Sequence, residues 1–175
     1  MIRHVAFLRA VNVGKRRVAM ARLREVVEDL GFSDVSTYVN SGNVAFSTSI
    51  VEERLEPSID AALEAAFGFP VPSFVRSVDH LARIVTRRPF GDIGAGETHL
   101  VVFLREEVSE STRLAAEALS NDTDRLAPVG REVHWLIAGN VMDSSLTPKQ
   151  WRTLGEQPST SRNTTMLTKL VAKLS

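Results

Sequence analysis

The chain has 175 residues, of which 43% are hydrophobic and 24% are charged, and its formal net charge is zero. This composition supports a packed core and excludes the disordered class, in which low hydrophobicity accompanies high net charge. The absence of cysteine excludes disulfides, thiolate metal sites and a cysteine nucleophile. Apolar stretches are far shorter than the roughly 20 residues that cross a bilayer, and no secretory signal precedes the first predicted strand, so we expect a cytoplasmic protein without membrane contact.

Basic residues gather at both ends of the chain. Residues 1–24 contain seven arginines and lysines and no acidic residue, and residues 147–175 contain five basic residues and one acidic residue. Since the total is zero, the middle of the chain is acidic. The simplest interpretation is that the basic ends pair with the acidic middle in the fold.

The first half of the chain alternates strand-like and helix-like patterns. In chain order we predict a strand at 4–8, a helix at 20–30, strands at 35–39 and 43–46, a helix starting near 57 and ending at 68, a strand at 72–76 and a helix at 77–85. Gly42 is expected to be the left-handed residue of the hairpin. The helix after residue 50 is placed at Pro57 because proline is tolerated in the first helical turn.

The second half repeats the order of strand, helix and hairpin. We predict a strand at 98–104, a helix around 114–119, strands at 124–127 and 131–138, a short helix at 147–154 and a terminal helix from 163. Thr147, Pro148 and Gln150 match a capping box with proline at the first helical position. Asn163 is expected to cap the terminal helix.

These elements predict an α/β (α+β) protein with two small ferredoxin-like subdomains, in which helices pack on one face of mixed or antiparallel sheets. The first subdomain spans residues 1–90 and includes a connecting helix, the glycine-rich linker spans 91–97, and the second subdomain spans 98–175.

Familiar catalytic and cofactor motifs are not matched. Gly14 and Lys15 follow a strand and precede a helix, but a phosphate-binding loop of nucleoside triphosphatases needs a glycine where Arg9 stands and a hydroxyl where Arg16 stands. His99 and His134 could meet across a sheet, yet without neighbouring acids they make a poor metal site. We therefore predict no cofactor and no metal. No general acid and base pair is evident, so whether the chain is an enzyme stays open.

Several segments resemble the uncharacterised bacterial family called domain of unknown function 1697. These segments are Leu8 to Gly14, Met20 to Phe32, Thr37-Tyr38, Asn40 to Val44, His99 to Leu104, Ser161 to Asn163 and Thr168 to Leu170. The family pattern has glycine where this chain has Ala10, and tryptophan where it has Thr164. The resemblance implies an α/β structure with two small subdomains and carries no established activity.

Three groups of polar residues stand at the ends of predicted elements, where side chains can meet a ligand. They are Arg9, Asn12, Gly14 and Lys15; Ser41, Gly42 and Asn43; and Arg162 and Asn163. The first hypothesis is that the three groups converge between the subdomains on a small anionic ligand that carries phosphate or carboxylate. With equal weight, the same residues could lock the halves together through buried hydrogen bonds.

The second functional hypothesis is nucleic-acid binding. Ferredoxin-like sheets are a common RNA-reading scaffold, and the first 24 residues are basic. The zero net charge and the single tyrosine disfavour it. A protein-interaction module is a third possibility, and the oligomeric state is left open by the sequence.

Overall fold

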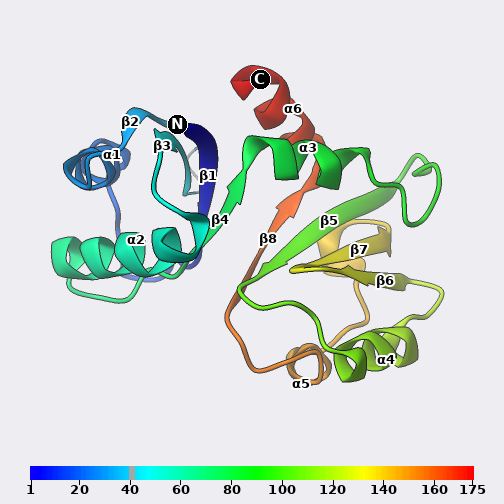
Figure 1. Ribbon diagram of the computed structural model, residues 1–175. Helices are drawn as coiled ribbons and strands as arrows, with labels where there is room; N and C mark the ends of the chain where they lie inside the picture. Colours follow the sequence, from blue (N-terminus) through cyan, green and yellow to red (C-terminus); the bar gives the residue numbers. More distant parts are fainter. Residues whose placement is uncertain (40–41) are drawn as a thin grey trace. The chain divides into compact units, whose positions relative to one another are not determined.

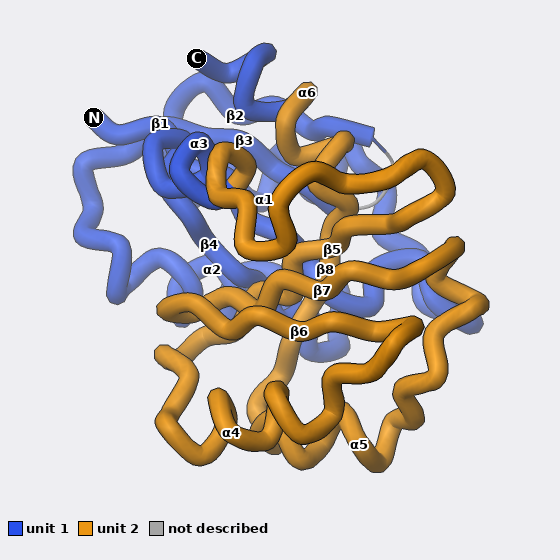
Figure 2. Tube along the Cα trace, turned by 90° about the vertical axis from the view of Figure 1, so that its right-hand side faces the viewer, with its two compact units in different colours: residues 1–84, 170–175 blue, residues 85–169 orange. Residues whose placement is uncertain are grey.

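The computed structural model describes residues 1–39 and 42–175, and the chain divides into two compact units. Unit 1 comprises residues 1–84 and 170–175, and unit 2 comprises residues 85–169 (Figure 2). Within the described residues, each unit contains a four-stranded antiparallel sheet, which confirms the expected mixture of helices and antiparallel strands. The linker at 91–97 and the subdomain limits given above stay predictions. Among the described helices, none has the length and apolar character needed to cross a membrane.

Unit 1 follows the predicted order of elements (Figure 1). The elements are β1 (Ile2–Leu8), α1 (Met20–Asp29), β2 (Ser33–Thr37), β3 (Asn43–Thr48), α2 (Glu52–Phe67), β4 (Ser73–Ser77) and α3 (Val78–Thr86), whose last two residues belong to unit 2. The strand order in the sheet is β2-β3-β1-β4, with every neighbouring pair antiparallel.

Helices α1 and α2 cover one face of the unit 1 sheet (Figure 1). Alternate strand residues supply one side of this core, and helical residues three or four apart supply the other. The buried members include Ala6, Leu8, Phe46, Leu23, Val27, Ile59 and Leu63. This core explains why period-two and helical apolar patterns located these elements in the sequence.

The predicted start of α2 near Pro57 is wrong, because the helix begins at Glu52 and contains Pro57. Two acidic residues in the first turn, Glu52 and Glu53, favour a helix N-terminus there. Proline at 57 removes one backbone hydrogen bond, and at this exposed position water can satisfy the carbonyl left without a partner. The end of the helix at Gly68, which adopts a φ of 78°, is confirmed.

Unit 2 contains the second sheet, with strand order β6-β7-β5-β8. Its elements are β5 (Glu97–Leu104), α4 (Glu110–Leu119), β6 (Asp124–Val129), β7 (Glu132–Ala138), the short 3-10 helix η1 (Val141–Asp143), α5 (Pro148–Arg152), β8 (Ser159–Asn163) and α6 (Thr164–Leu174), of which residues 170–174 belong to unit 1. The capping box of α5 is present as predicted. Trp135 and Trp151 pack edge to face in the core, with ring centroids 4.8 Å apart.

Strand β8 was not predicted from the sequence. Its residues are serine, threonine, serine, arginine and asparagine, without apolar alternation. The strand forms at the sheet edge because it pairs along its length with β5, from Leu100 opposite Asn163 to Leu104 opposite Ser159. Such pairing depends on a partner strand more than on local propensity.

Candidate functional site

The loop at residues 9–19 joins β1 to α1 in unit 1 and is strongly basic. It carries four cationic residues and no acidic residue, and all four are exposed: Arg9, Lys15, Arg16 and Arg17. The carboxyl end of β1 therefore leads into a short segment in which positive charge is concentrated near solvent.

The backbone of this loop alternates between conformations. Ala10, Asn12 and Gly14 have φ values of 57°, 58° and 61°, whereas the residues between them do not have positive φ. The left-handed conformation is uncommon for non-glycine residues such as Ala10 and Asn12. Within the described part of the chain, no hydrogen bond of ordinary geometry involves the amide N–H groups of residues 11–15. Alternation of this kind turns successive N–H groups toward one side of the chain.

Side chains within the loop hold this conformation. The amide oxygen of Asn12 accepts a 2.9 Å hydrogen bond from the backbone N–H of Val18, which closes the loop. The Arg17 guanidinium donates to the carbonyls of Gly14 and Arg16 at 2.8 and 2.9 Å. The Arg16 guanidinium lies 4.9 Å from the centroid of the Phe69 ring. Asn12, Arg16 and Arg17 are thus engaged by the fold.

Unlike Asn12, Arg16 and Arg17, the side chains of Arg9 and Lys15 are not engaged by the fold. Within the described residues, neither side chain makes a hydrogen bond or an ion pair, and both side chains are exposed. Only the backbone of Arg9 is engaged, through a 2.9 Å hydrogen bond from its N–H to the carbonyl of Pro72. These two cations are the side chains of the loop that are available to a ligand.

The hairpin between β2 and β3 lies against the start of the loop. The N–H of Leu8 donates to the carbonyl of Gly42 at 2.8 Å. A Cβ atom added at Gly42 would lie 2.7 Å from Cγ2 of Val11 and 3.1 Å from Cβ of Leu8, so only glycine fits. Asn43 is completely buried and donates from Nδ2 to the carbonyl of Tyr38 at 2.9 Å. Ser41 lies outside the described residues.

The third predicted group lies in unit 2. Arg162, on β8, donates from Nη1 to Oγ1 of Thr160 and to the carbonyl of Ser161, both at 2.8 Å. Burial lowers the pKa of the Arg162 guanidinium to about 10, so it remains charged at neutral pH. Asn163 accepts a 2.8 Å hydrogen bond from the N–H of Thr165, which confirms its predicted role as the cap of α6.

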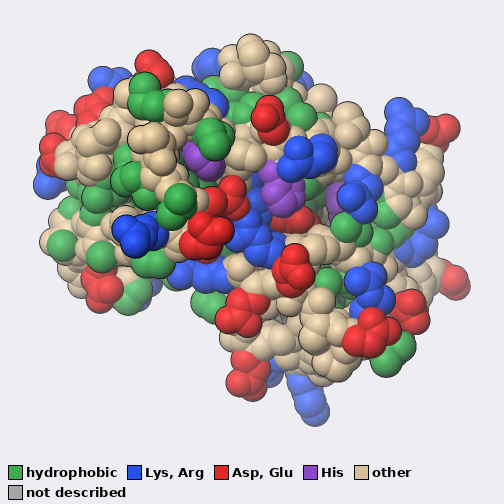
Figure 3. All heavy atoms as spheres, viewed as in Figure 1, with side chains coloured by type: hydrophobic (Ala, Val, Ile, Leu, Met, Phe, Trp, Pro, Cys, Tyr) green, Lys and Arg blue, Asp and Glu red, His purple; other side chains and the backbone are tan. Residues whose placement is uncertain are grey.

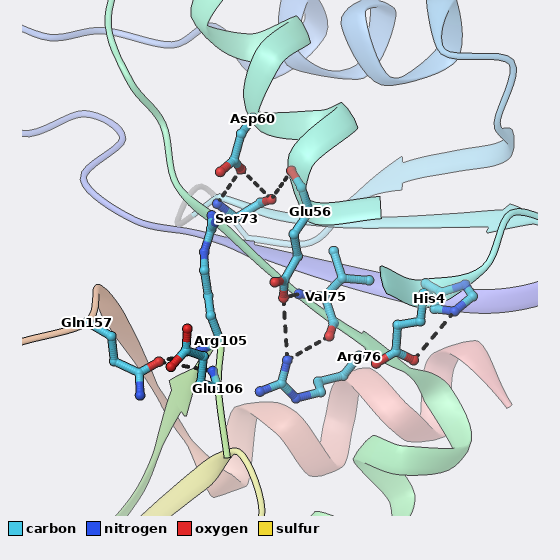
Figure 4. Close-up of polar contacts among 10 residues, drawn as sticks. His4, Glu56, Asp60, Ser73, Val75, Arg76, Arg105, Glu106 and Gln157 are labelled. Carbon is cyan, nitrogen blue, oxygen red and sulfur yellow. Dashed lines mark hydrogen bonds and ion pairs between the residues drawn. The ribbon is translucent and has the colours of Figure 1, made fainter. Parts of the chain in front are cut away.

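A buried polar network in unit 1 was not predicted (Figure 4). Arg76 on β4 is completely buried, with Nη1 3.6 Å from Oε1 of Glu56 and 2.7 Å from the carbonyl of Val75. Oδ1 of Asp60 accepts hydrogen bonds from the N–H and the hydroxyl of Ser73, at 2.8 and 2.6 Å. The network joins α2 to β4. An arginine directly after the apolar residues Phe74 and Val75 of a predicted strand is the sequence signal that could have indicated it.

A pair of buried histidines crosses the unit 2 sheet. Nε2 of His99 on β5 lies 3.0 Å from Nδ1 of His134 on β7, which confirms that the two can meet across a sheet. Burial lowers the pKa of His99. Burial, with the nearby charges of His99 and Arg87, lowers the pKa of His134 to about 4. Within residues 1–39 and 42–175, no group of three or more histidine, aspartate and glutamate side chains has the arrangement of a metal site.

Comparison with known proteins places these features in a family. The family model described as "Protein of unknown function (DUF1697)" matches residues 1–134. The structure of conserved bacterial protein SP0830 from Streptococcus pneumoniae is similar, with a TM-score of 0.78 and 22% sequence identity, covering 99% of this chain and 98% of that chain. At this identity the similarity shows a common fold alone. None of the curated proteins matches the sequence. The chain belongs to the DUF1697 family of proteins of unknown function.

Proposed function

We propose that unit 1 binds a small anionic ligand, through a phosphate or carboxylate group, at the loop of residues 9–19. Arg9, Gly14 and Lys15 are the ligand-binding residues of this proposal. The observation that carries it is the run of five amide N–H groups at residues 11–15, which make no hydrogen bond within the described chain and lie among left-handed residues.

A run of unengaged amide N–H groups suits an anion for a physical reason. Consecutive N–H groups that point to one side present several partial positive charges to the same atom, as in phosphate-binding loops. Gly14, at a φ of 61°, has no heavy atom within 4 Å of the position that a Cβ would take, so the space beside it is open. A ligand oxygen could approach the backbone closely there.

The side chains of Arg9 and Lys15 add positive charge that would attract an anion to this loop. Arg9 lies two residues before the run of amides and Lys15 is its last residue, and guanidinium and ammonium groups pair well with oxyanions. The alternative, that these residues only stabilise the fold, accounts better for Asn12, Gly42 and Asn43, each of which is already bound or tightly packed. The proposal therefore narrows the sequence-based set to the exposed part of the loop.

Nucleic-acid binding receives less support. The strand order β2-β3-β1-β4 supports a ferredoxin-like arrangement of unit 1, in which RNA would stack on the sheet face opposite the helices. The chain as a whole has no net charge and a single tyrosine, so it lacks the excess of positive charge and the aromatic residues typical of RNA-binding sheets. The small anion is therefore the better interpretation of the basic loop.

The test is calorimetric titration of the full chain with inorganic phosphate and with citrate, at constant ionic strength. Arg9→Ala and Lys15→Ala are each expected to weaken binding at least tenfold, while stability changes by less than about 0.5 kcal/mol because both side chains are exposed. Arg24→Ala is the matched control, since Arg24 lies on α1 and pairs with Glu28 at 3.0 Å.

Two results would contradict the proposal. The first is an equal loss of affinity in Arg24→Ala, which would indicate a response to net charge alone. The second is tighter binding of a short RNA than of phosphate, with an affinity that falls steeply with salt, which would favour nucleic acid instead.

A further inference from the structure

We infer that unit 2 contains a second, separate site, a cavity that binds a phosphate monoester of a small polar molecule. The cavity has a volume of about 490 Å³ and lies beside His99. It is formed by the segment at residues 85–93, the beginning of β5 and the first turns of α6. This volume falls within the range of small-molecule sites and exceeds what a phosphate group alone would fill.

Cationic and hydroxyl groups line one part of the cavity. Arg87 and Arg88 both contribute to its wall, and Arg88 is paired with Asp92 at 2.6 Å, whereas Arg87 makes no hydrogen bond or ion pair within the described residues. Thr164 and Thr165 contribute from the start of α6, where the helix dipole favours an anion. In the space-filling view, histidine side chains lie beside lysine and arginine side chains near the position of β5 (Figure 3).

His99 supplies the second and independent indication of a ligand. The residue is only 9% exposed and lines the cavity, and its Nε2 is bound to His134. Its other ring nitrogen, Nδ1, has no hydrogen bond within the described part of the chain. A largely buried ring that lines a cavity and has one ring nitrogen without a protein partner is suited to bind a polar atom in that cavity.

The histidine pair also determines what kind of atom fits. Because burial lowers the pKa of both rings, each is neutral at pH 7 and carries one N–H. When Nδ1 of His134 donates to Nε2 of His99, the proton of His99 must reside on Nδ1. A ligand oxyanion accepts from that N–H and stabilises this tautomer.

Phosphate is favoured over carboxylate by the spread of the donors. Arg87, the hydroxyl of Thr165 and the ring of His99 come from three separate segments, and three terminal oxygens can engage more of them than two can. The hydroxyl of Thr164 already donates to the carbonyl of His99 at 3.1 Å. Phe90, whose ring lies 5.5 Å from that of His99, adds an apolar contact for the organic part of the ligand.

The test uses the full chain titrated with ribose 5-phosphate, AMP, inorganic phosphate and citrate. Arg87→Ala and Thr165→Ala are expected to weaken binding of the phosphate esters at least tenfold. Arg152→Ala, an exposed arginine of α5 outside the cavity, is the matched control and should bind normally. Histidine ring ¹⁵N spectra should show His99 shifting toward the Nδ1–H tautomer when the ester is added.

The outcomes separate this site from the loop of unit 1. Binding of esters that is lost in Lys15→Ala and retained in Arg87→Ala would place all anion binding in unit 1 and overturn the second site. Citrate binding more tightly than both esters would overturn the assignment to phosphate. Loss in Arg87→Ala with normal binding in Lys15→Ala would support the cavity whatever happens at the loop.

Discussion

The indole Nε1 of Trp135 donates a 2.8 Å hydrogen bond to Oδ1 of Asp124, a carboxylate that is completely buried in unit 2. The hydroxyls of Ser144 and Ser145 and the N–H of Ser145 donate further bonds of 2.7 to 2.8 Å. Burial by itself would raise the pKa of Asp124, but these hydrogen bonds outweigh it and hold the pKa below its usual value. One ionised carboxylate thus ties β6, β7 and the segment after η1 together.

Replacing Asp124 by Ala is expected to destabilise unit 2 by about 2 to 4 kcal/mol, because four donors lose a charged acceptor in a buried site. Asp122→Ala, an exposed neighbour, should change stability by less than about 0.5 kcal/mol. Urea denaturation followed by tryptophan fluorescence measures this directly, since both tryptophans lie in unit 2. Equal effects of the two variants would refute the role given to Asp124.

The stability of unit 2 is expected to fall as the pH is lowered from about 6.5 to about 4. In this window the unfolded chain binds a proton at His134, whose ordinary pKa is 6.5, while the folded chain does not, because its pKa there is about 4. A shift of this size corresponds to about 3 kcal/mol. The same fluorescence-detected denaturation, repeated across the pH range, provides the measurement.

His134→Asn is the matching variant for the pH experiment. The asparagine Nδ2 takes the place of Nδ1 and can still donate to His99, but it does not titrate. We expect this variant to lose most of the pH dependence between 6.5 and 4. An unchanged slope would mean that other groups, and not His134, cause the acid sensitivity.

Ala10→Gly is expected to stabilise unit 1 by roughly 0.5 to 1 kcal/mol. The left-handed conformation at a φ of 57° costs alanine about 1 to 2 kcal/mol, which exceeds the entropic cost of glycine in the unfolded chain. Ala61→Gly, at an exposed position inside α2, is the control and should destabilise by about 1 kcal/mol. Thermal unfolding followed by circular dichroism should show a higher melting temperature for Ala10→Gly and a lower one for Ala61→Gly. A lower melting temperature in both variants would contradict the left-handed conformation at Ala10.

Glu56→Gln is expected to destabilise unit 1 by roughly 1 to 3 kcal/mol. Glutamine keeps the oxygen that accepts from the N–H of Val75, at 2.8 Å, but removes the charge opposite the buried Arg76 guanidinium. Glu64→Gln, exposed on the same helix, should be nearly neutral. Hydrogen exchange of the β4 amides reports on this part of unit 1, and faster exchange in Glu56→Gln alone is the expected pattern.

Local patterns predicted most elements because the forces behind them are local or periodic. The buried run of β1 and the apolar spacing of α1 are set by which residues can face a core. The caps at Thr147 and Asn163 depend on residues within three positions. The start of α2 was predicted wrongly because only the local preference of Pro57 for a first helical turn was considered. The acidic first turn at Glu52 and Glu53 favours the earlier start.

Of the two proposed sites, one could be suggested from the sequence and the other could not. Arg9, Gly14 and Lys15 were recognisable because charge and a loop after a strand are visible in the sequence. The cavity beside His99 was not, because its walls come from segments more than 60 residues apart that meet only when β8 pairs with β5. No local signal marks Arg87 or Thr165 as members of one site.

The sequence by itself determined the helices and strands of the two sheets apart from β8, the family, and the position of a basic loop. Tertiary structure decided that the polar strand β8 pairs with β5, that Arg76 is buried opposite Glu56, and that residues 170–175 belong to unit 1, where Lys173 lies 5.4 Å from the Tyr38 ring. The physical reason is the distance along the chain over which each interaction acts. Periodicity and capping act over a few residues, whereas strand pairing, burial of charge and cavity walls depend on partners that chain folding brings together.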